Sequence, residues 1–138
     1  MSNTETVESY LLRSGVQHDH VDDATWVIQL EDSRASNIVA HIEEPIILFS
    51  TPIFDVSDQT HDREGLFQKL LQLNSELMHS AYALQGQSVV LSGAQELENL
   101  DLNEFQAVLD DMTIALDKHQ DHLTPWNPKA SANDTNNS

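Results

Sequence analysis

Hydrophobic positions recur at the helical period in three parts of this chain, and each part predicts an amphipathic helix. The first spans 4–14, where Thr4 or Thr6 can cap the start and Gly15 suits the end. The second spans 66–79, and its apolar face consists of Leu66, Phe67, Leu70, Leu71, Leu73, Leu77 and Met78. The third spans 102–119, and its apolar stripe consists of Phe105, Val108, Leu109, Met112 and Leu116.

Polar residues mark the ends of the second and third helices. Asp101 can accept from free backbone N–H groups, and Glu104 three residues later completes a capping-box pattern. Thr60 or Asp62 could cap the second helix. Asn74 lies close to the apolar side of that helix, so we expect it to close the helix or to bond a nearby backbone group.

Alternating apolar and polar residues, with β-branched side chains, indicate five strands. Three lie at 26–30, 38–42 and 46–54, and a hairpin over 80–92 supplies two more with its turn at 85–87. Pro52 cannot donate to a ladder, so we expect it at an edge, a bulge or a strand end. The polar stretches 16–24 and 31–37 are predicted as a connection and a turn.

The predicted order is therefore helix, three strands, helix, two strands, helix. Short polar turns between the first three strands favour an antiparallel meander. The apolar face of one antiparallel sheet needs helices to cover it, which gives an α+β fold with about five strands in a single domain over 1–123. Residues 124–138 are mostly small or polar and are predicted as a disordered tail, from which Trp126 could still dock on the domain.

Charge is the dominant feature of the composition. Six basic residues stand against 23 acidic ones, which gives a net charge of −17, and no Lys or Arg lies between Lys69 and Lys118. Phosphate backbones and anionic lipids are repelled, so nucleic acid and membrane surfaces are poor partners. Such a charge either keeps the protein soluble or steers it toward a basic partner.

The sequence gives no sign of export or of membrane insertion. The start, MSNTETVESY, lacks the basic and apolar regions of a signal peptide, and no apolar run approaches the roughly 20 residues that span a bilayer. The chain has no cysteine, hence no disulfide framework and no thiolate site. We expect a cytoplasmic protein.

Histidine supplies the clearest candidate chemistry. His18 and His20 lie in a polar stretch, and His119 and His122 share a helix face, so the two pairs could meet around a metal; alternatively, the first pair is solvated and the second favours a helix C-terminus. Adjacent carboxylates such as Asp110 and Asp111 diverge on a helix and make poor acid–base pairs. No G-x-S-x-G motif or glycine cluster occurs, which argues against an enzyme and against a bound cofactor.

Three motifs resemble the YbjN-like branch of the type III secretion chaperone-like superfamily. They are L-L-x-L-N-x-E-L-x-H at 70–79, A-Y-A-L-x-G-x-x-V-V-L at 81–91, and E-L-E-N-L-D-L-N-E-F-Q-A-x-L-D-x-M at 96–112. The resemblance extends over most of 7–119. It implies the fold of small, acidic, dimeric chaperones that hold an extended segment of an effector protein, and it carries over no catalytic residue.

We therefore interpret the chain as a non-enzymatic, chaperone-like or regulatory module that binds a protein segment as a homodimer. Ile46, Leu48 and Phe49 are the candidate partner-binding residues, because an apolar groove or an exposed sheet edge accepts extended peptides. The alternative for these three residues is an ordinary place in the core. The alternative function is a small-molecule or metal-sensing domain that uses the histidine pairs.

Overall fold

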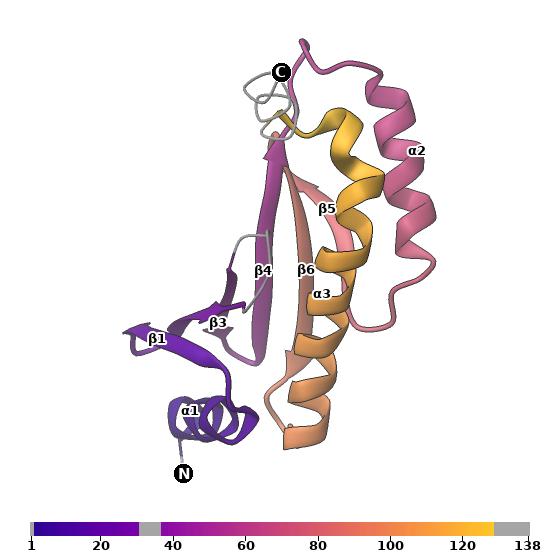
Figure 1. Ribbon diagram of the computed structural model, residues 1–138. Coiled ribbons are helices and arrows are strands. Elements are labelled where there is room, and N and C mark those ends of the chain that lie inside the picture. Colours follow the sequence, from indigo (N-terminus) through magenta and orange to yellow (C-terminus); the bar gives the residue numbers. More distant parts are fainter. Residues whose placement is uncertain (1, 31–36, 129–138) are drawn as a thin grey trace.

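The computed structural model describes residues 2–30 and 37–128, which form an α+β fold (Figure 1). The predicted fold class is thereby confirmed. In chain order the elements are α1 (Asn3–Ser14), β1 (Gln17–Asp22), β2 (Thr25–Gln29), β3 (Ile38–Glu43), β4 (Ile46–Asp55), α2 (Arg63–Asn74), β5 (Ala81–Gln85), β6 (Ser88–Glu96), α3 (Leu102–Leu123) and the short 3-10 helix η1 (Thr124–Trp126).

The strands form one antiparallel sheet in the order β1-β2-β3-β4-β6-β5. The first four strands make the predicted meander, and β6 lies between β4 and β5. The sheet has six strands, one more than predicted, because the stretch expected to be a polar connection contains β1. Its side chains are almost all exposed at the sheet edge, so backbone pairing with β2 forms the strand without an apolar pattern in the sequence.

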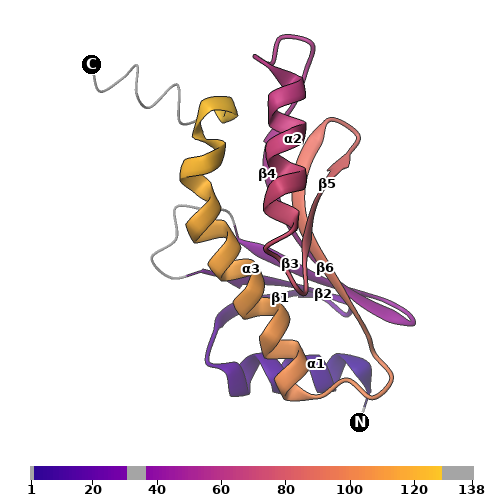
Figure 2. The ribbon, with the colours of Figure 1, turned by 90° about the vertical axis from the view of Figure 1, so that its right-hand side faces the viewer.

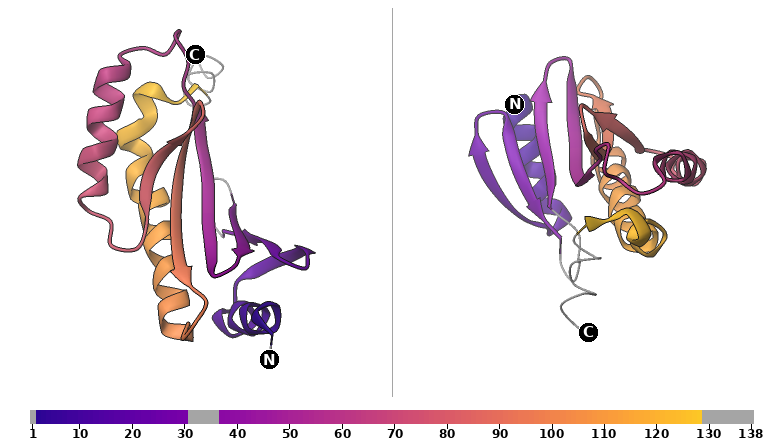
Figure 3. Two further views of the ribbon diagram at one scale, coloured as in Figure 1. Left: turned by 180° about the vertical axis from the view of Figure 1, so that it is seen from behind. Right: turned by 90° about the horizontal axis from the view of Figure 1, so that it is seen from above.

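All three helices cover the same face of the sheet. Cross-strand partners share a face, and Trp26, Ala40, Phe49 and Gly93 form one such row on the covered side. Val7 and Leu11 of α1 are buried in the same cluster as this row. Viewed from above, α2 and α3 lie together on one side of the long strands (Figure 3).

Position 93 is restricted to glycine by the close approach of two elements. A Cβ atom there would lie 2.8 Å from the backbone oxygen of His79 and 3.2 Å from a methyl carbon of Val108. Any other residue would push the chain before β5 or the helix α3 away from the sheet.

The opposite face of the sheet has no helix over it among residues 2–30 and 37–128. Its rows, read across the strands, are Thr25, His41, Leu48 and Ala94, then Val27, Val39, Ser50, Ser92 and Ala81. Pro52 lies on this face beside a register shift in β4, which agrees with one of the three positions expected for it, a bulge. The predicted turn at 31–37 lies outside the described residues except for Asn37.

The first helix begins earlier than predicted. Ser2, not Thr4 or Thr6, is the N-cap: its hydroxyl accepts from the Glu5 backbone N–H, and the Glu5 carboxylate accepts from the Ser2 N–H. Gly15 ends the helix in the left-handed conformation (φ 72°), as its position in the sequence indicates.

The second helix is shifted toward the N-terminus relative to its prediction. Asp62 caps it through a bond from the Gly65 N–H, so the helix begins at Arg63 and ends at Asn74. Leu77 and Met78, predicted on its apolar face, lie beyond its end. The prediction for Asn74 is confirmed, because its side chain bonds both the N–H and the C=O of Tyr82 at the start of the hairpin (2.7 and 3.2 Å).

The last helix matches its predicted start and stripe. Asp101 accepts from the Glu104 N–H, and every residue of the predicted stripe is buried. The helix continues to Leu123, and the Trp126 indole of η1 donates to the Asp62 carbonyl and packs against the core. The structure describes residues as far as 128, and the predicted domain boundary at 123 and the predicted disordered tail over 124–138 stay predictions.

Candidate protein-binding surface

The three candidate partner-binding residues divide between the two faces of β4. Phe49 points to the covered face, where it is fully buried. Its ring packs edge-on against the Phe105 ring, with 5.6 Å between the ring centres. Ile46 and Leu48 point to the uncovered face and are half-buried. Phe49 is therefore a core residue, whereas binding by Ile46 and Leu48 stays a prediction.

Leu48 lies in a shallow depression of about 490 Å³ at the end of the sheet. The chain that leads into β5 forms one wall, and the last residues of β6 form the other. Met78 is the most exposed large hydrophobic residue of the described chain, with 85% of its surface accessible. The lining residues are Leu48, Met78, His79, Ser80, Ala81, Ser92, Gly93, Ala94 and Gln95.

Gln95 lines this depression, and its side chain carries an unsatisfied acceptor on the covered face of the sheet. Its Nε2 donates to the Glu104 carbonyl at 2.7 Å, which fixes the amide. Its Oε1 is buried and has no hydrogen-bond partner within the described residues. A buried acceptor without a donor is unfavourable by about 1–3 kcal/mol.

A second apolar surface follows the groove between α2 and β5, which lie side by side in Figure 2. The groove has a volume of about 230 Å³. Leu71 and Leu84 on its rim are 72% and 47% exposed. The groove is lined by Phe67, Leu70, Leu71, Asn74, Tyr82, Ala83 and Leu84.

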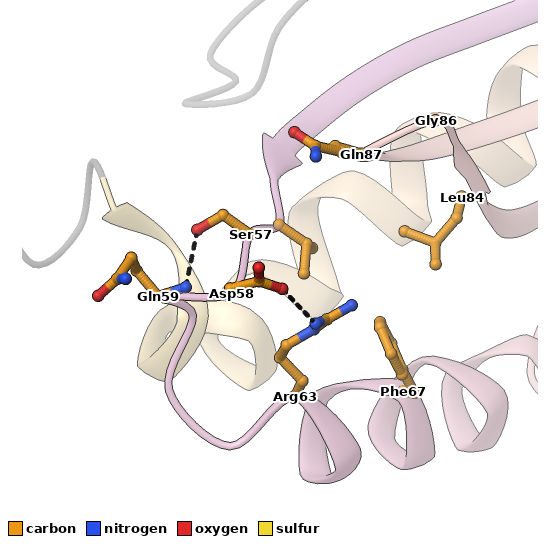
Figure 4. Close-up of a pocket in the computed structure, with 9 residues that line it drawn as sticks. Ser57, Asp58, Gln59, Arg63, Phe67, Leu84, Gly86 and Gln87 are labelled. Atoms are coloured by element: carbon orange, nitrogen blue, oxygen red, sulfur yellow. Dashed lines mark hydrogen bonds and ion pairs between the residues drawn. The ribbon is translucent and has the colours of Figure 1, made fainter.

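The same groove opens at one end into a polar depression of about 340 Å³ (Figure 4). Phe67 and Leu84 line both. Arg63 lies 3.3 Å from the exposed Asp58 carboxylate and 5.7 Å from the centre of the Phe67 ring. The groove therefore combines an apolar floor with the ion pair of Arg63 and Asp58 at its end.

The candidate metal ligands His18 and His20 lie on β1 and face α1. The Glu8 carboxylate accepts from the Trp26 indole (2.6 Å), and it lies 3.2 Å from His18 Nε2 and 3.8 Å from His20 Nδ1. The bond from Trp26, and then the bond and charge of His18, lower the pKa of Glu8. This cluster links α1 to the edge of the sheet.

His119 and His122 lie at the other end of the molecule, near the C-terminus of α3. His119 is buried and His122 lies in the last turn of α3, in line with the alternative that this pair favours a helix C-terminus. Its Nδ1 lies 2.8 Å from the Tyr82 hydroxyl, and its Nε2 lies 3.6 Å from Glu76. Burial lowers the pKa of His119, and Glu76 opposes this effect.

The two histidine pairs therefore do not meet. Within residues 2–30 and 37–128, no group of three or more metal-binding side chains is arranged to hold an ion. In the same part of the chain, no helix is both long and apolar enough to cross a membrane.

With the fold and surfaces established, comparison with known proteins identifies the family. The family model CesT_Tir_1, which represents type III chaperones, matches residues 1–128. This chain belongs to the CesT_Tir_1 family. The resemblance of its motifs to the type III secretion chaperone-like superfamily is thereby confirmed. No curated protein matches the sequence.

Solved structures share the fold of this CesT_Tir_1 member at low sequence identity. A chain of the heterodimeric ExoU-SpcU complex from the type III secretion system of Pseudomonas aeruginosa is 20% identical, with a TM-score of 0.63, covering 88% of this chain and 98% of the other. YbjN from E. coli is 12% identical, with a TM-score of 0.61, covering 86% and 91%. A chain from the complex of the Yersinia pestis chaperone SycH with a YscM2 fragment is 12% identical, with a TM-score of 0.55, covering 83% and 99%.

Two features of these surfaces are missing from the sequence-based prediction. Met78 continues the apolar pattern of α2, so it was assigned to the helix face; the Asn74-Ser75 pair was the available signal that the helix ends earlier. Gln95 has no distinctive sequence context, because its unsatisfied oxygen results from how the end of β6 meets α3.

Proposed function

We propose that this CesT_Tir_1 chain is a non-enzymatic, chaperone-like or regulatory module that binds an extended segment of a partner protein. The observation that carries the proposal is the depression on the uncovered sheet face, where Leu48 lies with the 85%-exposed Met78. Exposed apolar surface of this kind marks protein-interaction sites. Family membership supports the same role.

Similar structures supply the class of partner. SpcU was solved together with ExoU, and SycH with a fragment of YscM2. A further similar chain comes from the HopA1-SchA chaperone–effector complex, at 11% identity and a TM-score of 0.58, covering 81% of this chain and 88% of the other. By analogy, the partner of this chain is another protein rather than nucleic acid or a membrane, in line with its net charge of −17. A cytoplasmic location is part of this proposal.

The lining of the depression is consistent with binding rather than catalysis. His79 and Ser80 are neighbours there, but the Ser80 hydroxyl donates to the Asp111 carboxylate instead of to a histidine. Asp111 also accepts from the His79 N–H and so fixes the chain before β5. Because the proton of Ser80 is bonded to a carboxylate and not to a histidine base, Ser80 orders the loop before β5 and is not activated as a nucleophile.

We also propose that two copies associate through the groove between α2 and β5. Leu71 and Leu84 expose apolar surface there. Acidic copies repel one another least where positive charge is concentrated, and α2 carries Arg63 and Lys69 against Glu64 alone. By contrast, α3 carries Lys118 against Glu104, Asp110, Asp111, Asp117 and Asp121.

The partner-binding role can be tested with a photo-cross-linking residue at position 78. The same residue at Ile114, which is 53% exposed on α3, is the matched control. We expect one protein of the source cell to cross-link at 78 but not at 114, and a synthetic peptide of the cross-linked segment to bind while being unfolded alone. Repeated absence of an enriched protein at 78 in low salt contradicts the proposal.

A further inference from the structure

β5 is a five-residue strand at the edge of the sheet, and its only ladder partner is β6 among the strands that the structure describes. On its other side, the Asn74 amide bonds the N–H and the C=O of Tyr82. Its third attachment is the Tyr82 side chain, whose hydroxyl lies 2.8 Å from Nδ1 of His119 in α3. Elements with few partners are the ones that open locally. The position of β5 therefore depends on the contact between Tyr82 and His119.

The His119 ring is buried between groups from three parts of the chain, and only 3% of the residue is accessible. Tyr82 approaches the ring from β5, and Glu76 approaches it to 3.6 Å from the segment after α2. Lys118 and His122 act on it from within α3. Burial is the main cause that lowers the pKa of His119, and Glu76 opposes it. In the folded chain the ring is therefore neutral at about pH 7.5.

The neutral ring carries its proton on Nε2. The Tyr82 hydroxyl keeps its own proton, because burial raises its pKa, and donates to Nδ1. Nε2 then carries the N–H and turns it toward the Glu76 carboxylate. A second proton can bind only at Nδ1, which is the atom that accepts from Tyr82. Proton uptake by His119 thus removes the acceptor from the contact that holds β5.

A protonated ring leaves the Tyr82 proton without a partner. Both ring nitrogens then donate, so the hydroxyl can only accept from Nδ1, and its own proton needs another acceptor. Tyr82 is 6% exposed, and its hydroxyl has no second hydrogen-bond partner within residues 2–30 and 37–128. A buried donor without an acceptor and a buried charge are both unfavourable. Both effects favour a conformation in which the hydroxyl and the ring separate and meet water.

Separation of these two side chains would change the groove between α2 and β5, which lie side by side in Figure 2. Tyr82, Ala83 and Leu84 form the side of the groove that belongs to β5, and residues of α2 form the other side. Tyr82 and Leu84 point to the same face of the sheet because they are two positions apart on the strand. Release of Tyr82 from α3 therefore displaces one side of the groove.

We propose that Tyr82 and His119 form a pH-sensitive contact that controls this groove: proton uptake by His119 releases β5 and opens the groove, and proton loss closes it. The open and closed states belong to a single chain. The inference therefore does not depend on whether two copies associate through the groove, or on what binds at the depression near Leu48.

Hydrogen–deuterium exchange of the backbone amides tests the contact. Protection is expressed relative to the unfolded chain at the same pH, which removes the intrinsic pH dependence of exchange. Between about pH 7.5 and 5.5, the protection of the β5 amides should fall by up to about tenfold, because the open state binds a proton that the closed state resists. Low concentrations of urea should not change it, because local opening exposes little surface.

The matched variants are His119→Gln and His122→Gln. Glutamine at 119 still offers an acceptor to Tyr82 but does not titrate, so the protection of β5 should change by less than about twofold over the same pH range. His122 is exposed in the last turn of α3, and its replacement should leave the response of the original chain. If His119→Gln does not fold, Tyr82→Phe decides the question: it removes only the hydroxyl, so β5 should be poorly protected already at about pH 7.5.

Two outcomes overturn the proposal. One is a pH response in His119→Gln equal to that of the original chain, which assigns the response to other groups. The other is β5 protection that equals the protection of the amides joining β4 to β6 and falls with urea in the same way, because β5 then opens only when the whole chain unfolds. Molar mass measured on the same samples tests the association of copies separately.

Discussion

The hydroxyl of Tyr82 in β5 lies 2.8 Å from Nδ1 of His119 in α3, which joins two elements 37 residues apart in the sequence. Burial raises the pKa of Tyr82, so the hydroxyl keeps its proton and donates to the ring. The other ring nitrogen, Nε2, lies 3.6 Å from Glu76. A neutral imidazole with its proton on Nε2 therefore accepts the Tyr82 bond at Nδ1 and turns its N–H toward Glu76.

Acidification should weaken the fold through His119. Its pKa in the folded chain is lowered from 6.5, mainly by burial. Below about pH 6.5 the unfolded chain therefore takes up a proton that the folded chain resists, and stability is lost as the pH falls toward the folded pKa. Above pH 6.5 this contribution is fully present. The melting temperature should therefore fall as the pH is lowered from about 7.5 to about 5.5.

The matched variants for this prediction are His119→Gln and His122→Gln. His122 is exposed and one helical turn away, so its replacement should leave the pH dependence almost unchanged. His119→Gln should flatten it, because the titrating ring is removed. Equal pH profiles for both variants would assign the effect to groups other than His119.

Phe105→Ala should be among the most destabilising substitutions. The ring is fully buried and contacts Tyr10 and Phe49, each at 5.6 Å between ring centres. We expect a loss of about 3–5 kcal/mol in the free energy of unfolding, measured by urea denaturation. Ile114→Ala on the exposed side of the same helix should change it by about 0.5 kcal/mol or less.

Asn74→Ala should expose the edge of β5. The Asn74 side chain now bonds both backbone groups of Tyr82 that point away from β6. Without this side chain, we expect the free energy of unfolding to fall by about 1–3 kcal/mol. We also expect slow aggregation, measured by light scattering, because an open strand edge pairs with other chains. Asn103→Ala, exposed at the start of α3, is the control. An Asn74→Ala chain as stable and monodisperse as the control would show that water replaces the amide without loss.

Leu71→Glu should produce a monomer if the groove between α2 and β5 joins two copies. Leu71 is 72% exposed, so the substitution adds charge without disturbing the core. The measurement is molar mass by size-exclusion chromatography with light scattering. Leu12→Glu, at a residue 66% exposed on α1, should leave the mass unchanged. A chain that is monomeric before any substitution contradicts the dimer proposal directly.

The elements that the sequence predicts well are those with a strong period. The stripe of α3 and the alternation at 26–30 correspond to buried rows, because burial on one face imposes the pattern. β1 lacks such a pattern, since it buries little and is formed by backbone bonds. The predicted C-terminal end of α2 lies too late in the chain, because apolar residues continue after the helix ends at Asn74.

The candidate surface was only partly accessible to sequence reasoning. Ile46, Leu48 and Phe49 form one apolar run, but alternation along a strand sends Phe49 into the core and the other two to the opposite face. The depression beside Leu48 lies where β6 continues beyond the shorter β5, which no local pattern records.

The late position of β6 in the chain has a consequence for biosynthesis. β4 pairs with it along 46–55, yet β6 ends only at residue 96. While the ribosome is still adding residues 56–87, the growing chain presents a long bare ladder with Ile47 and Phe49 uncovered, a state prone to mispairing. Nascent chains stalled in this interval should need a holding factor more than chains released after residue 123.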